Sequence, residues 1–588
     1  MLAQCLQAQS TSPKSLWQVR YEGDAIVNPK HDQVIKPDGF SVNSHTSGAY
    51  NVYVHRVLKK PVRRISFSYR AEGAVTKAPI RLMDAGANVL WQHDASGTSS
   101  GSVTLSDLNV HGQLVFQIGG REANPSDVMT EYSISDFQIT EGKIEPKKDA
   151  DGFVVIDNLT DLRSYATQDG VKVRLKPGHY QLDKAYCRQF IQFTGSNSVY
   201  DLRGANIMVD TRLFSRTDLA PGINDAVMYC AIAIHGDGVQ IEGPYVETYG
   251  DTPGHQSRNK VFNLTGKNVT LKNAEIRTAG SNPWGYGSFY GLGGGDVRKM
   301  NGIRIAWPGE NIKVIGCKVH MRAMGHAIFV QGAKNTLIED CHVDGLLRTT
   351  NDILAETSGY AFDKNFKAHR GGYIEGVMVA DDGAFLPGEM YSLSEDGIRV
   401  YPQAQKGANT ATGSTTIKDC TVTNMRRGIC TGLNTAGDKV INCKVTNCVA
   451  AGFNVGNADT LINCSADAKY AEAFCIPYVD ARNAYVEGTI LDSRGGMKNE
   501  LLVKINGSGH EVKIQTADPA FIPEQMQIKL STSESYGGPW DGSPTHAKEI
   551  TLKNKTKAPV VLLPGTEKVQ LESEGNVLDE SKNKRKSK

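Results

Sequence analysis

A short phrase, hydrophobic-x-x-Cys-x-aliphatic, recurs through the middle of the 588-residue chain. Neighbouring copies stand 21 to 24 residues apart, except for one gap of 79 residues. The phrase places cysteines at Cys317, Cys341, Cys420, Cys443 and Cys464. Between the copies run short apolar alternations, such as Ile303-Arg-Ile305 and Ile398-Arg-Val400. A period of this length, with at least two alternating strands and Gly or Asn turns, predicts a solenoid of stacked β-coils.

The same spacing predicts the structural role of the repeated cysteines. Coils that stack in register place these five side chains one above another inside the core, where a free cysteine behaves as a small hydrophobic residue. Metal-binding CxxC spacing is absent from the sequence. We therefore expect buried, reduced thiols rather than a metal centre.

Residues 15–143 follow a different pattern, in which apolar and polar residues alternate without a coil repeat. Alternating strands at irregular spacing, separated by Gly and Asn turns, predict an antiparallel β-sandwich. The runs FQIGG and YSISDFQITEG resemble the last two strands of jelly-roll carbohydrate-binding modules. That resemblance implies glycan binding, and a structural cap for the solenoid is the alternative.

The repeat domain is expected to span residues 144–572. Its entry, Leu159–Leu182 (LTDLRSYATQDGVKVRLKPGHYQL), combines a short helical stretch, a strand and a Pro-Gly turn. It resembles the entry of right-handed parallel β-helix proteins of the pectate-lyase-like superfamily. The resemblance implies a right-handed coil, a small helix that caps the first coil, and action on a polysaccharide.

Composition limits the partners. Lys and Arg total 65 against 63 Asp and Glu, a formal net charge of +2, so nothing suggests nucleic acid. No apolar run is long enough to cross a bilayer. We interpret residues 1–14 as disordered or as a signal-peptide remnant, and residues 573–588 as a basic tail. A secreted or periplasmic monomer with a polysaccharide substrate is expected.

Two insertions interrupt the repeat, near residues 280–296 and 346–393. Because side chains fill the interior of a β-helix, its substrate must lie along an outer face, between loops. The first insertion is too rich in Gly for a strand and too aromatic for a linker, and it offers Trp284 and Tyr286 for substrate contact. The two insertions therefore indicate a site in the middle of the rod.

Strand alternation selects the residues that face out at this site. Arg304, Arg399 and Tyr401 point outward if their apolar neighbours point inward. Two arginines on one outer face form a candidate clamp for a carboxylate or sulfate, although a solvated strand face explains a single Arg equally well. His326 has the parity of the core-facing residues, so only a turn that reorients it makes it a general base. Arg322 is exposed by the same alternation.

The second insertion supplies further titratable groups, among them Arg348, Asp352 and Tyr360. A plain solvated loop is the alternative explanation for this density of charge. Asp381-Asp382-Gly383 offers oxygen ligands for calcium, although the regular acidic spacing of a calcium loop is missing. No metal or other cofactor is required by the sequence.

Two enzymatic functions fit these residues, and we rank a lyase first. β-Elimination on a uronic-acid polymer needs a cation at the C6 carboxylate, a base and a proton donor. Arg399 with Arg304 or Arg348, or else calcium, would neutralise the C6 carboxylate. His326 would abstract the C5 proton, and Tyr360 or Tyr401 would donate a proton to the leaving oxygen.

The alternative is a glycoside hydrolase, which uses two carboxylates about 5–10 Å apart. Asp352 or Glu356 would pair with Glu395 or Asp396 for this purpose. The paired Asp-Asp and Gly-His-Gly motifs of polygalacturonase-like hydrolases are not matched in full, because Ala327 follows His326. A non-enzymatic glycan-binding rod is the third possibility.

Overall fold

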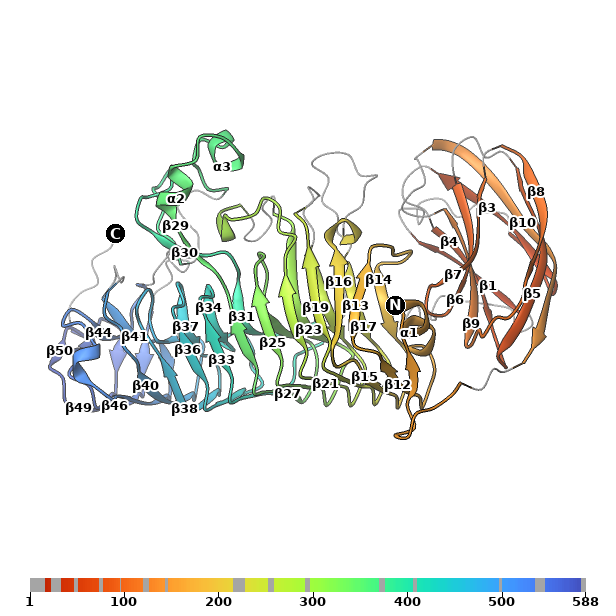
Figure 1. Ribbon diagram of the computed structural model, residues 1–588. Helices are drawn as coiled ribbons and strands as arrows, with labels where there is room; N and C mark the ends of the chain where they lie inside the picture. The colour runs from red at the N-terminus through yellow and green to blue at the C-terminus, as the bar shows by residue number, and fades with distance from the viewer. Residues whose placement is uncertain are drawn as a thin grey trace.

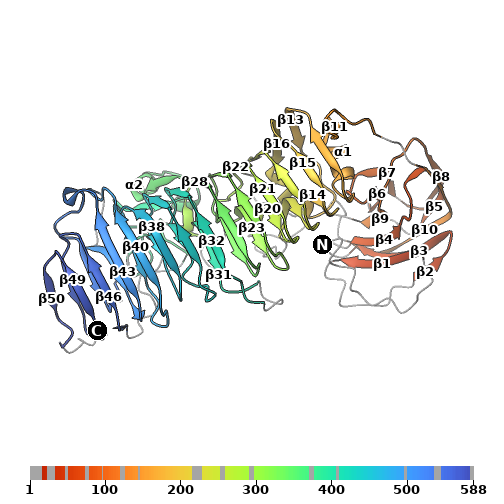
Figure 2. The same cartoon turned by 90° about the horizontal axis from the view of Figure 1, so that it is seen from below.

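The structure is a computed structural model of the whole chain, and it consists of a β-sandwich followed by a long β-rod (Figure 1). The described residues are 16–22, 33–46, 51–72, 78–95, 97–119, 126–142, 146–214, 228–251, 258–290, 297–369, 376–404, 410–495, 500–534 and 545–582. The predicted disordered segment 1–14 lies outside them, as do residues 291–296 of the first insertion and the end of the basic tail. Figure 2 shows the rod from below, with the sandwich at one end.

The sandwich consists of two antiparallel five-stranded sheets. The first contains β1 (Trp17–Glu22), β4 (Asn51–Val57), β9 (Gln113–Gly119), β6 (Ala78–Asp84) and β7 (Val89–Ala95) in spatial order. The second contains β2 (Gln33–Lys36), β3 (Gly39–Thr46), β10 (Ser126–Glu141), β5 (Val62–Glu72) and β8 (Ser99–Leu105). Trp17 fills the space between them with Phe40, Phe116 and Phe137, in ring contacts of 4.8–5.9 Å. The predicted sandwich is thus confirmed.

The rod consists of parallel coils. One sheet has 22 strands, from β11 (Val154–Ile156) to β49 (Gln570–Ser573), and a second has 13 strands. The strands of the second sheet are β14 (Gln189–Phe193), β17 (Cys230–Ile234), β20 (Arg258–Leu264), β23 (Lys299–Ala306), β26 (Ile328–Gln331), β31 (Asp396–Tyr401), β34 (Arg427–Cys430), β37 (Ala451–Asn454), β39 (Phe474–Ile476), β41 (Leu501–Ile505), β44 (Gln527–Leu530), β47 (Val560–Leu562) and β50 (Val577–Asp579). This confirms the predicted parallel β-helix.

Four of the five Cys phrases form two short strands with a sharp bend between them, and the fifth, at Cys464, lies within the single strand β38 (Thr460–Ala466). In one copy, β24 (Lys313–Ile315) and β25 (Lys318–Met321) flank Gly316 and Cys317. The residue before the cysteine has a positive φ in every copy, and it is Gly, Asp or Asn, the types that adopt this left-handed conformation most readily. The five repeated cysteines are free and almost fully buried, as predicted.

A short helix closes the first coil and contacts the sandwich. Helix α1 (Leu159–Tyr165) begins at Asn158, whose side chain accepts a hydrogen bond from the Asp161 N–H, and it buries Leu159 and Leu162. The first sandwich sheet lies against this end of the rod, where Asn88 Nδ2 donates to the Thr160 carbonyl at 2.9 Å. The predicted capping helix is confirmed, and one face of the sandwich covers the rod beside it.

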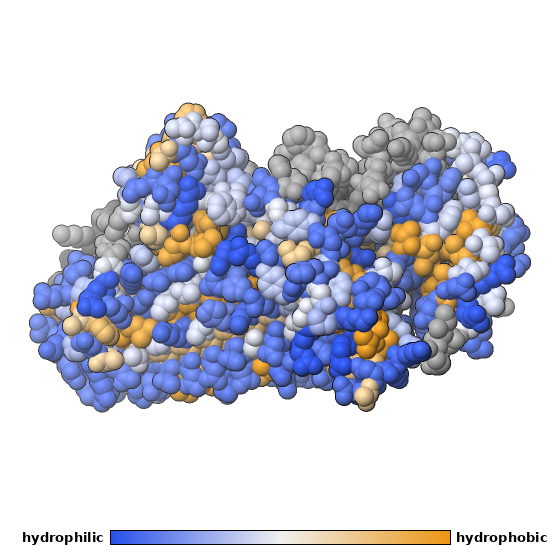
Figure 3. Space-filling view, in the orientation of Figure 1, coloured by the Kyte–Doolittle hydropathy of each residue, from blue (hydrophilic) through white to orange (hydrophobic). Residues whose placement is uncertain are grey.

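The two insertions fold together into an insertion module that rises above the rod (Figure 1). It contains η3 (Gly287–Phe289), β29 (Leu347–Thr349), α2 (Thr350–Leu354), α3 (Tyr360–Asp363) and β30 (Met390–Ser392). Its buried core consists of Tyr286, Phe289, Tyr290, Val297, Met324, Ile353, Ala361, Val377, Val379, Phe385, Tyr391 and Leu393. Figure 3 shows a mostly hydrophilic surface, with apolar residues gathered at the base of this module.

The rod extends further than the sequence suggested. Strand β50 pairs in parallel with β47, with Val560 opposite Val577. The basic tail predicted from residue 573 therefore contains the last strand of the 13-stranded sheet. The apolar pair Val577-Leu578 was too short to predict a strand, because charged residues follow it.

Candidate functional site

A cavity of about 370 Å³ opens over the 13-stranded sheet in the middle of the rod. It spans five consecutive strands, β20, β23, β26, β31 and β34, which pair in that order. Its lining residues are Met228, Arg258, Lys260, Lys299, Asn301, Arg304, His326, Phe329, Gln331, Glu395, Arg399, Tyr401, Arg426, Arg427, Leu433 and Tyr478. Seven of these side chains are cationic and one is a carboxylate, which contrasts with a chain of net charge +2.

Register brings the outward side chains together. Arg304 on β23 lies opposite Phe329 on β26, and Phe329 lies opposite Arg399 on β31. The flanking residues of each strand, such as Ile398 and Val400, are fully buried in the core. The alternation in the sequence therefore placed Arg304, Arg399 and Tyr401 on the correct face.

His326 lies in the turn before β26 and faces the cavity, although parity in a regular strand would turn it inward. The Asp396 N–H donates to His326 Nδ1 at 3.2 Å, and His326 Nε2 lies 2.7 Å from the Tyr401 hydroxyl oxygen. Burial lowers the pKa of His326 to about 4. The imidazole is therefore neutral at physiological pH, and its proton lies on Nε2, because Nδ1 already accepts a hydrogen bond.

Tyr401 contributes a hydroxyl group to the cavity. Burial raises the pKa of Tyr401 to about 12, while Arg399 acts in the opposite direction. The Arg399 guanidinium lies 4.8 Å from the centroid of the Tyr401 ring. The hydroxyl is thus protonated in the free protein, with a cation and an N–H donor that both favour a transient phenolate.

The two carboxyl groups here are held as anions. Burial alone would raise the pKa of Glu395, but Lys299, His326 and Arg426 hold it at about 2. Glu395 Oε1 is 2.8 Å from Lys299 Nζ, and Glu395 Oε2 is 3.4 Å from His326 Nε2. Asp396 is fully buried, and the surrounding arginines hold its pKa well below its usual range despite that burial.

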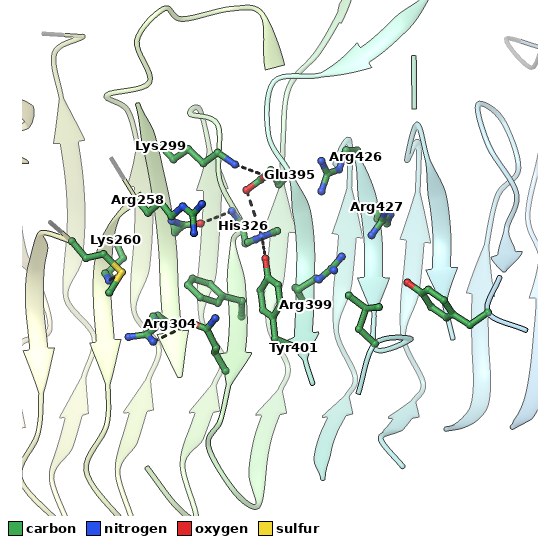
Figure 4. A pocket seen from close by; sticks show the side chains of 16 residues that line it. Arg258, Lys260, Lys299, Arg304, His326, Glu395, Arg399, Tyr401, Arg426 and Arg427 are labelled. Atoms are coloured by element: carbon green, nitrogen blue, oxygen red, sulfur yellow. Dashed lines mark hydrogen bonds and ion pairs between the residues drawn. The ribbon is translucent and has the colours of Figure 1, made fainter. Parts of the chain in front are cut away.

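Asp396 organises three of the cations. Its carboxylate lies 2.7 Å from Arg399 Nη1, 3.1 Å from Arg426 Nη2 and 3.9 Å from Arg427 Nη1. Three guanidinium groups therefore converge on this one buried carboxylate. Figure 4 shows these arginines on one side of His326 and Tyr401, and Lys260 and Arg304 on the other.

Five of the residues proposed from the sequence line this cavity: His326, Glu395, Arg304, Arg399 and Tyr401. The other six lie outside its lining. Arg348 Nη2 forms an ion pair with Glu356 Oε1 at 2.9 Å, and Tyr286 donates to the same carboxylate at 2.7 Å. Asp352 accepts from the Thr349 N–H in the capping box that begins α2. These three residues hold the insertion module together.

Tyr360, Arg322 and Trp284 also have contacts away from the cavity. The Tyr360 ring packs edge-on against Tyr290, with centroids 4.8 Å apart. Arg322 pairs with Asp344, and Trp284, which is 46% exposed, donates its Nε1–H to the Arg322 carbonyl at 2.9 Å. Tyr360 and Arg348 therefore belong to the packing of the insertion module. The sequence interpretation had grouped them with His326.

Five cations of the cavity were missed in the sequence: Arg258, Lys260, Lys299, Arg426 and Arg427. Lys260 lies opposite Asn301 of the next strand, and Arg427 lies opposite Asp396. Both positions follow from the coil register, but the insertion near residues 280–296 separates β20 from β23 in the sequence. Arg427 has the parity of the core-facing Ile429 in β34, so alternation alone would have turned it inward.

The proposed calcium ligand has another partner. Asp382 Oδ2 lies 2.8 Å from Lys367 Nζ. Within the described ranges, no group of three or more His, Cys, Asp or Glu side chains is arranged to hold a metal ion. In the same part of the chain, no helix is long and apolar enough to cross a membrane.

Comparisons with known proteins give likenesses of fold. No family model matches the chain, and no curated protein matches it. The catalytic domain of a GH87 alpha-1,3-glucanase is 11% identical, with a TM-score of 0.35 over 96% of this chain and 98% of that one. An alginate lyase from Paenibacillus sp. is 10% identical, with a TM-score of 0.31 over 73% of this chain and 97% of that one. Likeness at this level leaves substrate and reaction open.

Proposed function

We propose that this protein cleaves an anionic, uronic-acid-containing polysaccharide by β-elimination. The observation that carries the proposal is the His326–Tyr401 hydrogen bond of 2.7 Å, in a cavity lined by seven cations and one carboxylate. A proton-transferring pair among cations is what elimination beside a carboxylate needs. The geometry of the cavity supports this proposal independently of any relative.

The cations favour an acidic substrate. Positive side chains concentrated in a partly enclosed cavity attract anions more strongly than the same charges spread over an open surface. Guanidinium groups also bind carboxylates with two parallel hydrogen bonds. In this site, Arg399 and its neighbours would bind the C6 carboxylate of one sugar and so acidify the proton on C5.

Tyr401 is proposed to exchange protons with the sugar. Tyr401 first loses its hydroxyl proton to solvent as the substrate binds. The phenolate oxygen then takes the C5 proton; the electrons of the C5–H bond form the C4=C5 double bond; and the C4–O4 bond breaks. The leaving O4 then takes the proton back from Tyr401. His326 acts as a positioning residue in this scheme, because its Nε2–H donates to the Tyr401 oxygen and stabilises the phenolate.

The carboxylates support a hydrolase less well. A glycoside hydrolase needs one carboxylic acid with a raised pKa and a second carboxylate across the bond, about 5–10 Å away. Glu395 has a pKa of about 2, and Asp396 is adjacent in sequence and fully buried. Asp352 and Glu356 make their contacts in the insertion module.

Incubation with polygalacturonate, alginate and α-1,3-glucan tests the proposal. We expect one of the two uronates to yield products that absorb in the ultraviolet, because β-elimination leaves a conjugated C4=C5 unsaturated end. Cleavage of the glucan, or cleavage of a uronate without that absorbance, would refute elimination. Binding without cleavage of any of the three would favour the glycan-binding rod.

A further inference from the structure

The end of the cavity formed by β20 and β23 carries three cations that form no ion pair with any of the described residues. This β20 end consists of Arg258, Lys260 and Arg304. Lys260 is only 2% exposed, yet its ammonium group lines the cavity. Figure 4 shows Lys260 and Arg304 on the side of Tyr401 opposite to Arg427.

The contacts of Lys260 and Arg304 are all with neutral groups. Lys260 Nζ lies 3.4 Å from Met228 Sδ, a weak acceptor. Arg304 donates to Gln331 Oε1 at 3.0 and 3.2 Å and to Asn263 Oδ1 at 3.2 Å. No described carboxylate lies within ion-pairing distance of either, whereas Asp396 serves the arginines at the other end.

Such an arrangement is unfavourable in the free protein. Burial and the nearby Arg304 lower the pKa of Lys260 to about 7, while Cys230 acts weakly in the opposite direction. Burial raises the pKa of the Cys230 thiol to about 12, so it supplies no counter-charge at neutral pH. Burial likewise lowers the pKa of Arg304 to about 10. A buried cation without an anion costs stability, and a bound anion would offset that cost.

We propose that Lys260 and Arg304 bind a second acidic group of the substrate, a carboxylate or a sulfate, on a sugar unit two positions along the chain from the one that reacts at Tyr401. The inference deepens the proposed function and relies on it for the identity of the reacting unit. It assigns the protein to glycans that carry negative charge on repeated units, in preference to chains with one isolated uronate.

The spacing of the strands fits such a chain. Arg304 and Arg399 occupy the same register position on β23 and β31, with β26 between them. Strands lie about 4.8 Å apart, so the two positions are separated by about 10 Å along the rod. Each strand step is close to the length that one pyranose unit adds to an extended glycan. Phe329, in register between the two arginines, offers an apolar floor for the intervening ring.

Calorimetric titration tests the site without relying on cleavage. The probes are inorganic sulfate and acetate with the wild-type protein, and a uronate tetramer with the full-length Tyr401→Phe variant. We expect Lys260→Met to weaken binding of the tetramer at pH 6 by about tenfold to a hundredfold, the effect of losing a charged hydrogen bond. Lys260→Arg, which keeps the charge, should retain most of the affinity.

The pH dependence separates a charge effect from a packing effect. With Lys260 present, affinity should fall as the pH rises from 6 to 9, because the ammonium loses its proton. With Lys260→Arg, affinity should change little over this range. Equal affinity for every probe at pH 6 with and without Lys260→Met, the tetramer being measured in the Tyr401→Phe background, would overturn the inference. Identical pH profiles for the wild type and Lys260→Arg would also overturn it.

The outcomes also separate this inference from the proposed function. Uronate cleavage that is unaffected by Lys260→Met would refute the second acidic subsite and leave elimination standing. Lys260-dependent binding without ultraviolet-absorbing products would refute elimination and leave the subsite standing. Stronger binding of sulfate than of acetate would identify a sulfated glycan as the source of the second group, and the reverse order a polyuronate.

Discussion

The cavity and the insertion module use the same kinds of side chain in opposite ways. In the module, Arg348 has Glu356 as its counter-ion at 2.9 Å, and Tyr286 donates to the same carboxylate. In the cavity, Arg304 and Lys260 contact only amide oxygens and a thioether among the described residues. A buried cation that already has its carboxylate stabilises the fold, whereas one that lacks it is available to a ligand. Residue type alone therefore does not distinguish a structural arginine from a binding one.

The largest effect should come from the centre of the cavity. Tyr401→Phe keeps the ring beneath Arg399 but removes the oxygen bonded to His326, so we expect kcat on the uronate substrate to fall by about 10²–10⁴. Tyr478→Phe, at another tyrosine of the same lining, is the matched control and should lose less than about tenfold. Comparable losses in the two variants would remove Tyr401 from its proposed role.

The second prediction concerns the stability of the free protein. Because the pKa of Lys260 is about 7 in the folded state and about 10.5 when unfolded, the unfolded chain binds more protons between these values, and stability rises with pH through that window. The destabilising effect of Lys260 is therefore greatest below pH 7. We expect Lys260→Met to raise stability there by about 1–4 kcal/mol, measured by denaturant titration.

Lys299→Met is the control for that experiment. Lys299 lines the same cavity but forms a 2.8 Å ion pair with Glu395, so its substitution removes the counter-ion of a buried carboxylate. It should lower stability at the same pH. If both lysine substitutions changed stability in the same direction, that result would contradict the distinction between paired and unpaired cations.

In the module, Glu356→Gln should reduce stability by about 1–3 kcal/mol, because it weakens the hydrogen bonds from both Arg348 and Tyr286. Hydrogen exchange should show faster opening of residues 346–369, while binding of sulfate in the cavity stays unchanged. Asp492→Asn breaks an exposed pair with Arg494 and should change stability far less than Glu356→Gln. A loss of sulfate affinity in Glu356→Gln would place the module in the binding site after all.

The smallest effect is expected at Asp352. Asp352→Ala removes half of the capping box of α2 and should cost about 0.5–2 kcal/mol, with no change in kcat. Asp363→Ala, at the end of the short helix α3, is a control of the same chemistry without a capping contact in the structure described. A large loss of kcat in Asp352→Ala would revive the paired-carboxylate function and weaken the proposal for Tyr401.

Much of the architecture could be predicted from the sequence, because it depends on local residue patterns. The spacing of the cysteines predicted the coils, and alternation around Arg304 and Arg399 predicted which side chains face out. His326 was ambiguous, since parity applies only within a strand and this residue stands in the turn before β26. Tyr360 and Arg348 lie outside the cavity lining, and nothing in the sequence says that Tyr290 and Glu356 are their neighbours.

The sequence by itself thus determined the rod, the sandwich and the outward face of each strand. These features depend on periods of two residues and of one coil, which are properties of neighbouring positions along the chain. Only the tertiary structure decided which charges are neutralised, because Asp396 meets Arg426 and Glu395 meets Lys299 across separate coils. Coulomb interactions and burial depend on distance in space, and the two insertions hide that distance from a reader of the sequence.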